Sequence, residues 1–426
     1  MSCPFTGETS ELDAVLGAPT TAPAADTAPA PDSATAAAAS LTKKDSKNSR
    51  NEKKFRRGGK DDKVVRKDEG WFGPGSIAWQ VWSFPASALQ GFARAVTIEH
   101  LDPDLVAAVD ASGQVYKRTP VRYDRTMEYF VSWLSADSQT VIRMSDILMK
   151  VHDRSYGVNP VTGNTFEANR PSSQLWIHVT AWHSILYCYE TFGPGKLSRD
   201  EENEYWQQMK IAAAAQPINP DDVPTTRGEV LKYLDDWREK LSASEAAIRN
   251  VDHILDGFVT TQPDLPRWLN KLGRPFLRWS IIATFPRWMR PMLGVKQSKL
   301  MDTFAIAFWR PIYKVLRAQP RLFLWLVKRI CPRAVRYYEP LLLGIPAETP
   351  RVMTPEVSRR MYGNPMTPLE QREELLRKRE AGTGQKAYDH NHTDGILEFA
   401  GADDIESTQA TLKSTEEYET DLHEVS

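Results

Sequence analysis

Apolar residues recur with helical spacing along the chain between Pro85 and about Leu241. Separations of three and four residues place such side chains on one helical face, and the alternation typical of strands is almost absent. The pattern predicts helices over residues 85–99, 102–111, 121–135, 138–155, 171–192, 198–215 and 226–241. The clearest helix start is LSRDEENEYW, where Ser198 and Glu201 have the spacing of a capping box. The expected fold class is all-α.

Six prolines are expected to separate further helices over residues 263–345, because proline lacks the N–H that a helix interior uses. They are Pro275, Pro286, Pro291, Pro311, Pro320 and Pro332. From about Ala347 the chain is polar, with one helical stretch, TPLEQREELLRKREAG. These patterns predict a single large helical domain over residues 70–346 and a polar, largely disordered tail over 347–426.

Residues 1–69 have the composition of a disordered leader. Residues 17–42 are rich in Ala, Pro and Thr, and a mainly basic run without apolar periodicity follows. Such a composition cannot bury enough apolar surface to fold. Almost nothing aromatic is interleaved with the basic residues, so no nucleic-acid partner is expected.

The formal net charge of −1 hides a strong asymmetry along the chain. Residues 267–336 carry 16 Lys and Arg against one acid, Asp302, whereas residues 387–426 carry 11 acids against Lys413. Aromatic residues interleaved with cations favour an anionic membrane surface as a partner of 267–336. The alternative is a helical subdomain whose cations are only solvated. The acidic tail is expected to fold back on the basic segment and to weaken membrane binding.

Location signals are few. Cys3, Cys188 and Cys331 are too few for a disulfide framework, which favours a reducing compartment. No window holds roughly 18 uninterrupted apolar residues, and no secretory signal is recognisable. The sequence predicts a cytoplasmic protein with peripheral membrane association.

Common enzyme signatures such as GxGxxG, HExxH and GxSxG are absent from the sequence. Candidate chemistry therefore rests on polar residues inside apolar helices. His178 shares a helical face with Leu175 and Trp182, and a buried imidazole needs a hydrogen-bond partner or a metal. The alternative is an ordinary core histidine, and His183 lies too far around the helix to bind the same ion.

Two neighbouring helices carry further candidates. His152 ends the helix predicted over 138–155, where a histidine can also serve as a partner of the helix dipole. Arg122 and Thr126 are four residues apart on one face and suit a carboxylate, a propionate or an oxygen-derived ligand. The alternative is a surface arginine beside an ordinary helical threonine.

The order of these segments resembles the MpaB-type oxygenase family, which includes the rubber oxygenases. The resemblance covers FPASALQGFARAVTIEHLDP, VRYDRT, MKVHDRSYG and the WIHVT, FGP and LS segments that follow, roughly residues 73–241. It implies an all-helical protein with heme b as its cofactor. It also implies an oxidoreductase that uses O2 to cleave carbon–carbon double bonds in a hydrophobic or polyisoprenoid substrate.

Carried over by residue, the resemblance places the proximal ligand of the heme iron at His152. It places Arg122 and Thr126 beside the heme on its distal side, where Arg122 would contact the cofactor. It implies for His178 a role as a second axial ligand or as a residue of the catalytic pocket.

The sequence departs from the family where a Leu-His-Pro is usual, because Leu101 to Pro103 read Leu-Asp-Pro. The His-Ser expected a turn later reads Ala-Ser at 111–112. If the lost histidine serves catalysis, turnover fails, whereas a merely bracing histidine changes nothing. The alternative function is a non-catalytic lipid- or heme-binding protein at the membrane surface. A third hypothesis is a heme-free metal site with two histidines.

Overall fold

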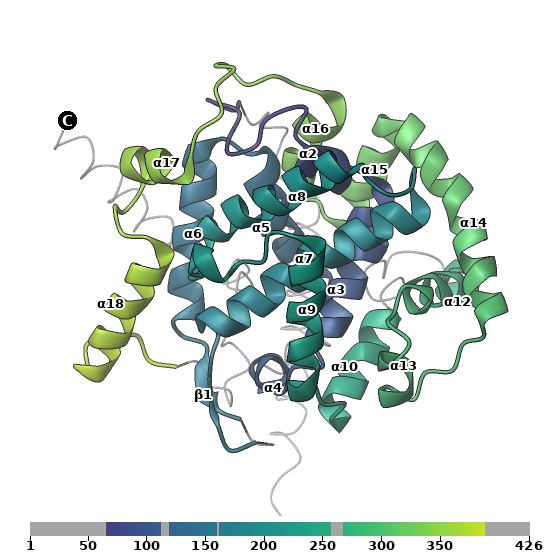
Figure 1. Ribbon diagram of the computed structural model, residues 1–426, viewed down its shortest axis with the longest axis horizontal. Helices are drawn as coiled ribbons and strands as arrows, with labels where there is room; N and C mark the ends of the chain where they lie inside the picture. Colours follow the sequence, from purple (N-terminus) through teal and green to yellow (C-terminus); the bar gives the residue numbers. More distant parts are fainter. Residues whose placement is uncertain (1–64, 112–118, 160–161, 257–266, 388–426) are drawn as a thin grey trace, which may run out of the picture. The chain divides into compact units, whose positions relative to one another are not determined.

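The computed structural model describes residues 65–111, 119–159, 162–256 and 267–387 of the 426-residue chain. Helices dominate these ranges, so the predicted all-α fold is confirmed (Figure 1). Their only strands, β1 (Tyr156–Val158) and β2 (Thr165–Glu167), form an antiparallel hairpin that the sequence did not predict. Most of the predicted leader and the acidic end of the tail lie outside the described residues.

The helices of the first half agree with the predicted ones to within a few residues, except that α2 was not predicted. They are α2 (Ile77–Trp82), α3 (Phe92–Glu99), α4 (Pro103–Ala111), α5 (Thr119–Ser135), α6 (Ser138–His152), α7 (Pro171–Phe192), α8 (Arg199–Ala212) and α9 (Arg227–Trp237). The later helices are α10 (Glu245–Leu255), α12 (Arg267–Ala283), α13 (Met289–Met292), α14 (Lys299–Ala318), α15 (Pro320–Ile330), α16 (Val335–Leu343), α17 (Pro355–Tyr362) and α18 (Pro368–Glu380). The capping box of α8 is confirmed, since the Glu201 N–H donates to Ser198 Oγ and the Ser198 N–H donates to Glu201 Oε2.

Helix α7 is buried along most of its length and organises the core. A wide π-helical turn, Ser87–Gly91, precedes α3 and packs against α7. A Cβ atom on Gly91 would lie 3.1 Å from Ile185 Cα, tighter than most Cβ contacts, so the close approach of this turn favours glycine. The helix predicted over 85–99 is therefore two elements, and tertiary packing sets the boundary between them.

The basic aromatic helices α12, α14 and α15 follow the proline pattern only in part. Pro320 begins α15 as expected, but Pro275 and Pro311 lie inside α12 and α14, so the prediction that they divide helices is wrong. Packing of α12 along α14, with the Phe276 and Phe308 rings 4.9 Å apart, offsets the hydrogen bonds that the two prolines remove. Among the described helices, none is both long and apolar enough to cross a bilayer.

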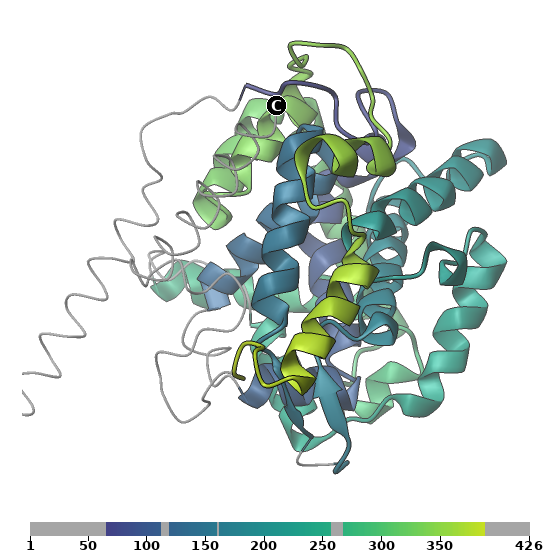
Figure 2. The same ribbon diagram turned by 90° about the vertical axis from the view of Figure 1, so that its left-hand side faces the viewer.

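Helices α17 and α18 pack on α6, as Figure 2 shows for the last coloured helices beside the blue α6. Arg359 Nη1 lies 2.8 Å from Asp146 Oδ1, and a Cβ atom on Gly363 would lie 2.3 Å from Ile142 Cγ2. The helical structure thus continues to residue 380, beyond the predicted domain end at 346. Helix α18 falls within the helical stretch predicted near residue 370.

Candidate functional site

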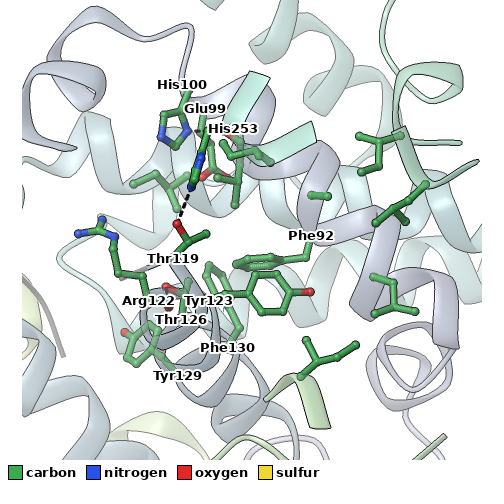
Figure 3. Close-up of a pocket in the computed structure, with 18 of the residues that line it drawn as sticks. Phe92, Glu99, His100, Thr119, Arg122, Tyr123, Thr126, Tyr129, Phe130 and His253 are labelled. Carbon is green, nitrogen blue, oxygen red and sulfur yellow. Dashed lines mark hydrogen bonds between the residues drawn. The ribbon is translucent and has the colours of Figure 1, made fainter. Parts of the chain in front are cut away.

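A cavity of about 580 Å³ lies between α3, α4, α5, α6, α7, α10, α12, α14 and α15. Its walls are mainly apolar and aromatic, and Figure 3 shows part of this lining. The apolar lining includes Phe92, Val96, Phe130, Ile177, Leu277, Ile281, Trp309, Ile312, Leu316 and Leu326. Volume and lining are those of a site for a cofactor or a small apolar molecule.

Helix α5 carries Arg122 and Thr126 on one face, as their spacing predicted, and both residues line the cavity (Figure 3). The Thr126 hydroxyl donates to the Arg122 carbonyl over 2.9 Å, so its proton is used and its oxygen is left as an acceptor. Tyr129 and Phe130 come from the same helix, and the Tyr129 hydroxyl donates to the Ala215 carbonyl at 3.1 Å. Arg122 and Thr126 thus bring polar side chains to a wall that is otherwise mainly apolar.

His152 is the last residue of α6, is buried, and lines the same cavity. Its Nδ1 atom lies 3.4 Å from the Gln174 Nε2 atom. Gln174 also donates from Nε2 to the Ala168 carbonyl at 2.7 Å, which fixes the orientation of the amide. His152, Arg122 and Thr126 are therefore brought together at one cavity by α6 and α5.

His178 is fully buried, as its helical face predicted, but it lies behind the cavity wall and not on it. Its Nε2 atom is 2.8 Å from the Met209 carbonyl, and the Trp133 and Trp182 rings flank it. Burial lowers the pKa of His178 to about 4, against a raising effect of the Met209 carbonyl, so the imidazole is neutral near pH 7. Of the site residues predicted from the sequence, Arg122, Thr126 and His152 line the cavity, whereas His178 does not.

Two glutamines that the sequence analysis missed connect the histidines. Gln216 donates from Nε2 to Gln174 Oε1 over 3.0 Å, and its amide neighbours the His178 ring. Both glutamines line the cavity. Gln174 lies four residues before His178 on α7, so helical spacing was the one signal that could have revealed it. The result is a buried polar path from His152 through Gln174 and Gln216 to His178.

A second polar group, from α3 and α10, occupies another part of the cavity wall. Figure 3 shows Glu99, His100 and His253 together near Thr119, whose Oγ1 atom lies 2.6 Å from His253 Nε2. Burial raises the pKa of Glu99 to about 8, although the hydrogen bond that the Thr180 hydroxyl donates over 3.0 Å lowers this pKa. Because a carbonyl only accepts, the 2.6 Å contact of His100 Nδ1 with the Val96 carbonyl puts a proton on Nδ1.

Asp102, the middle residue of the Leu-Asp-Pro segment at 101–103, does not line the cavity. Its Oδ1 atom accepts from the N–H groups of Asp104 and Leu105 at 2.9 and 3.0 Å and so caps α4. Its Oδ2 atom accepts from Trp237 Nε1 at 3.1 Å. In this chain the position braces the fold and contributes no group to the cavity.

Replacing Asp102 with alanine is expected to lower the free energy of unfolding by about 2 kcal/mol, because a cap is lost and a buried indole N–H loses its acceptor. Urea unfolding followed by circular dichroism measures the change. The matched control is Asp235→Ala, which removes an exposed carboxylate paired with Arg238 on the surface and should cost less than about 0.5 kcal/mol. Equal losses for both variants would contradict a bracing role.

Fold and cavity together define a helical protein with a mainly apolar internal cavity. Residues 79–318 match the catalytic domain described as that of the ER-bound oxygenase mpaB/B′ and rubber oxygenase. The match covers more than half of the chain, so the chain belongs to this family and carries a catalytic domain of the oxygenase type. No curated protein and no solved structure matches it.

Proposed function

We propose that the protein is a heme b-dependent oxygenase that oxidises or cleaves an unsaturated hydrophobic substrate, such as an isoprenoid. One observation carries the proposal: the apolar cavity brings together His152, Arg122 and Thr126, which come from two helices. The family match independently supports the oxygenase class. The cofactor and the substrate class are inferred from the chemistry of the cavity wall.

The residues of the cavity fit a heme. An imidazole nitrogen is a common ligand of heme iron, and His152 supplies one on an otherwise apolar wall. Arg122 offers a guanidinium, which binds carboxylates such as propionates by charge-assisted hydrogen bonds. Among the described residues there is no group of three or more His, Cys, Asp or Glu that could hold a bare metal ion. An imidazole and a guanidinium on an otherwise apolar wall are the donor set that we expect for a heme.

Each polar residue then has a definite task. When bound, the heme iron would supply the activation of O2. His152 would hold the iron, and Gln174 beside Nδ1 would influence which ring nitrogen carries the proton. Arg122 would orient an anionic or oxygen-containing group, while the apolar walls exclude water. Glu99, whose raised pKa of about 8 keeps it protonated near pH 7, would hold a transferable proton inside the cavity.

Titration of the purified protein with hemin tests the proposal. We expect a Soret band that saturates at one equivalent, followed by O2 consumption when squalene is added as a probe substrate. A protein that stays colourless with excess hemin contradicts the proposed cofactor. A Soret band without O2 consumption by any unsaturated probe favours the second candidate, a non-catalytic heme- or lipid-binding protein, which the predominantly apolar cavity also suits.

A further inference from the structure

The cavity reaches the protein surface beside α15. Leu322 and Trp325 both line the cavity, yet their exposed fractions are 45% and 60%. Leu326 and Ile330 of the same helix also line it, and they are only partly exposed. Residues that belong both to a cavity wall and to the outer surface mark an opening. We call this opening the α15 mouth.

The surface around the α15 mouth is unusually apolar. On α14, the exposed Phe304, Phe308 and Val315 lie within about 40° of one another around the helix axis, at 3.6 residues per turn. Phe308 contacts Phe276 of α12, whose exposed neighbour Leu272 lies one turn earlier. We define the exposed apolar face as Leu272, Phe304, Phe308, Val315, Leu322 and Trp325. Large exposed apolar areas of this kind mark sites of interaction with a partner or a membrane.

Cations outnumber acids along the two helices that carry most of this face, α14 and α15. Residues 299–330 contain seven Lys and Arg and one acid, Asp302. The Asp302 carboxylate is engaged by Arg290, whose Nη1 atom lies 2.9 Å from Oδ2. On α15, Arg321, Lys328 and Arg329 are exposed on the same side as Trp325. Aromatic side chains flanked by long cationic ones suit the headgroup region of an anionic bilayer.

We propose that the exposed apolar face binds an anionic bilayer and that an apolar substrate passes from the membrane through the α15 mouth into the cavity. A molecule dissolved in the acyl chains would then reach the cavity without crossing water. The access route rests on the proposed function, because it presupposes an apolar substrate. The membrane contact does not, because it follows from the surface alone.

Two observations favour a bilayer over a protein as the occupant of this face. A protein docked on Leu322 and Trp325 would cover the α15 mouth, whereas a fluid bilayer keeps the mouth in contact with apolar molecules. The charge of residues 299–330 is complementary to anionic headgroups along more than one helix. Helix α15 lies beyond residues 79–318, so the residues that define the mouth lie outside the family match.

Flotation of the full chain with vesicles tests the membrane contact. We expect binding to vesicles of phosphatidylcholine with 30% phosphatidylserine, and at least about tenfold weaker binding at high salt or to pure phosphatidylcholine. The double variant Phe308→Ser/Trp325→Ser should bind at least about tenfold more weakly. The matched control is Leu231→Ser/Met361→Ser, which removes comparably exposed apolar residues of α9 and α17 and should bind like the natural chain.

Quenching by brominated phosphatidylcholine tests the position of the mouth. Bromine on the acyl chains should quench part of the tryptophan fluorescence, and Trp325→Phe should remove a measurable share of that quenching. Three results overturn the proposal: no binding to anionic vesicles, binding that the double variant leaves unchanged, or quenching that Trp325→Phe leaves unchanged. In the first case, sedimentation velocity would show whether a second copy of the chain covers the face.

The vesicle measurements need no cofactor, so they separate this inference from the proposed function. A colourless protein that binds anionic vesicles through Phe308 and Trp325 contradicts only the heme proposal. A protein that binds heme but does not bind anionic vesicles contradicts only the membrane contact and the access route that depends on it.

Discussion

Replacing His152 with alanine is expected to abolish the Soret band that hemin gives with the natural chain. The imidazole lies buried at the cavity wall, and α6 holds it there with support from α17 and α18. Losing the axial ligand should weaken hemin binding by at least about a hundredfold, the upper end of what loss of a group around a metal site commonly costs. Absorption titration at micromolar concentration measures the loss directly.

Two other histidines of the cavity wall provide the comparison for this result. His100 and His253 reach the cavity from α3 and α10, so each is an alternative source of an imidazole ligand. His100→Ala and His253→Ala are expected to keep the band, with at most a small shift in its position. If either of these variants lost the band while His152→Ala kept it, the iron ligand would have to be assigned to that other histidine.

Lowering the pH from 7 to 4.5 is expected to destabilise the protein partly through His178. Its pKa is about 4 in the folded protein and about 6.5 in the unfolded chain, so the unfolded chain takes up the proton first. A depressed pKa contributes stability that is fully present above pH 6.5 and disappears as the pH falls toward 4. The full contribution is roughly 3 kcal/mol, of which about 2 kcal/mol is lost by pH 4.5.

The variant His178→Gln isolates this contribution, because glutamine keeps an N–H for the Met209 carbonyl but does not titrate. We measure the free energy of unfolding in urea at pH 7, 5.5 and 4.5. Between pH 7 and pH 4.5, the difference in this free energy between the two proteins should change by about 2 kcal/mol in favour of the variant. His253→Gln is the control and should show a smaller shift, since His253 is only half buried. A constant difference would mean that His178 is not a buried neutral imidazole. The variant should keep the Soret band, because His178 does not reach the cavity.

Local patterns predicted the helical elements well because each depends on neighbouring residues. The periodicity of α5 to α8 and the Ser198–Glu201 cap are confirmed to within a few residues. The β1–β2 hairpin escaped prediction because three-residue strands are too short to show alternation. Pro275 and Pro311 were misjudged because packing between α12 and α14, which outweighs the cost of a proline, is a long-range property.

The site was predictable only where it lies on one element. Arg122 and Thr126 are one helical turn apart on α5, so their shared helix face follows from spacing, whereas the cavity at that face is seen only in the structure. The place of His178 did not follow, because an apolar helical face indicates burial but not whether the burial is against core or cavity. The group of Glu99, His100 and His253 joins residues about 150 positions apart, and no local pattern reports such a contact.

The packing of α17 and α18 on α6 sets the smallest piece of this chain that can be studied alone. The family match ends at residue 318, but α15 forms part of the cavity wall. The helix that carries His152 packs against α17 and α18, which extend to residue 380. Residues 65–69 belong to the same piece, because the Arg66–Glu69 ion pair is buried and the Glu69 carboxylate accepts from the Ala347 N–H at 3.0 Å. A truncation at the limits of the match would therefore remove α17 and α18, which pack on the helix that carries the proposed iron ligand. An unstable or colourless fragment of that kind would say nothing about the activity of the whole protein.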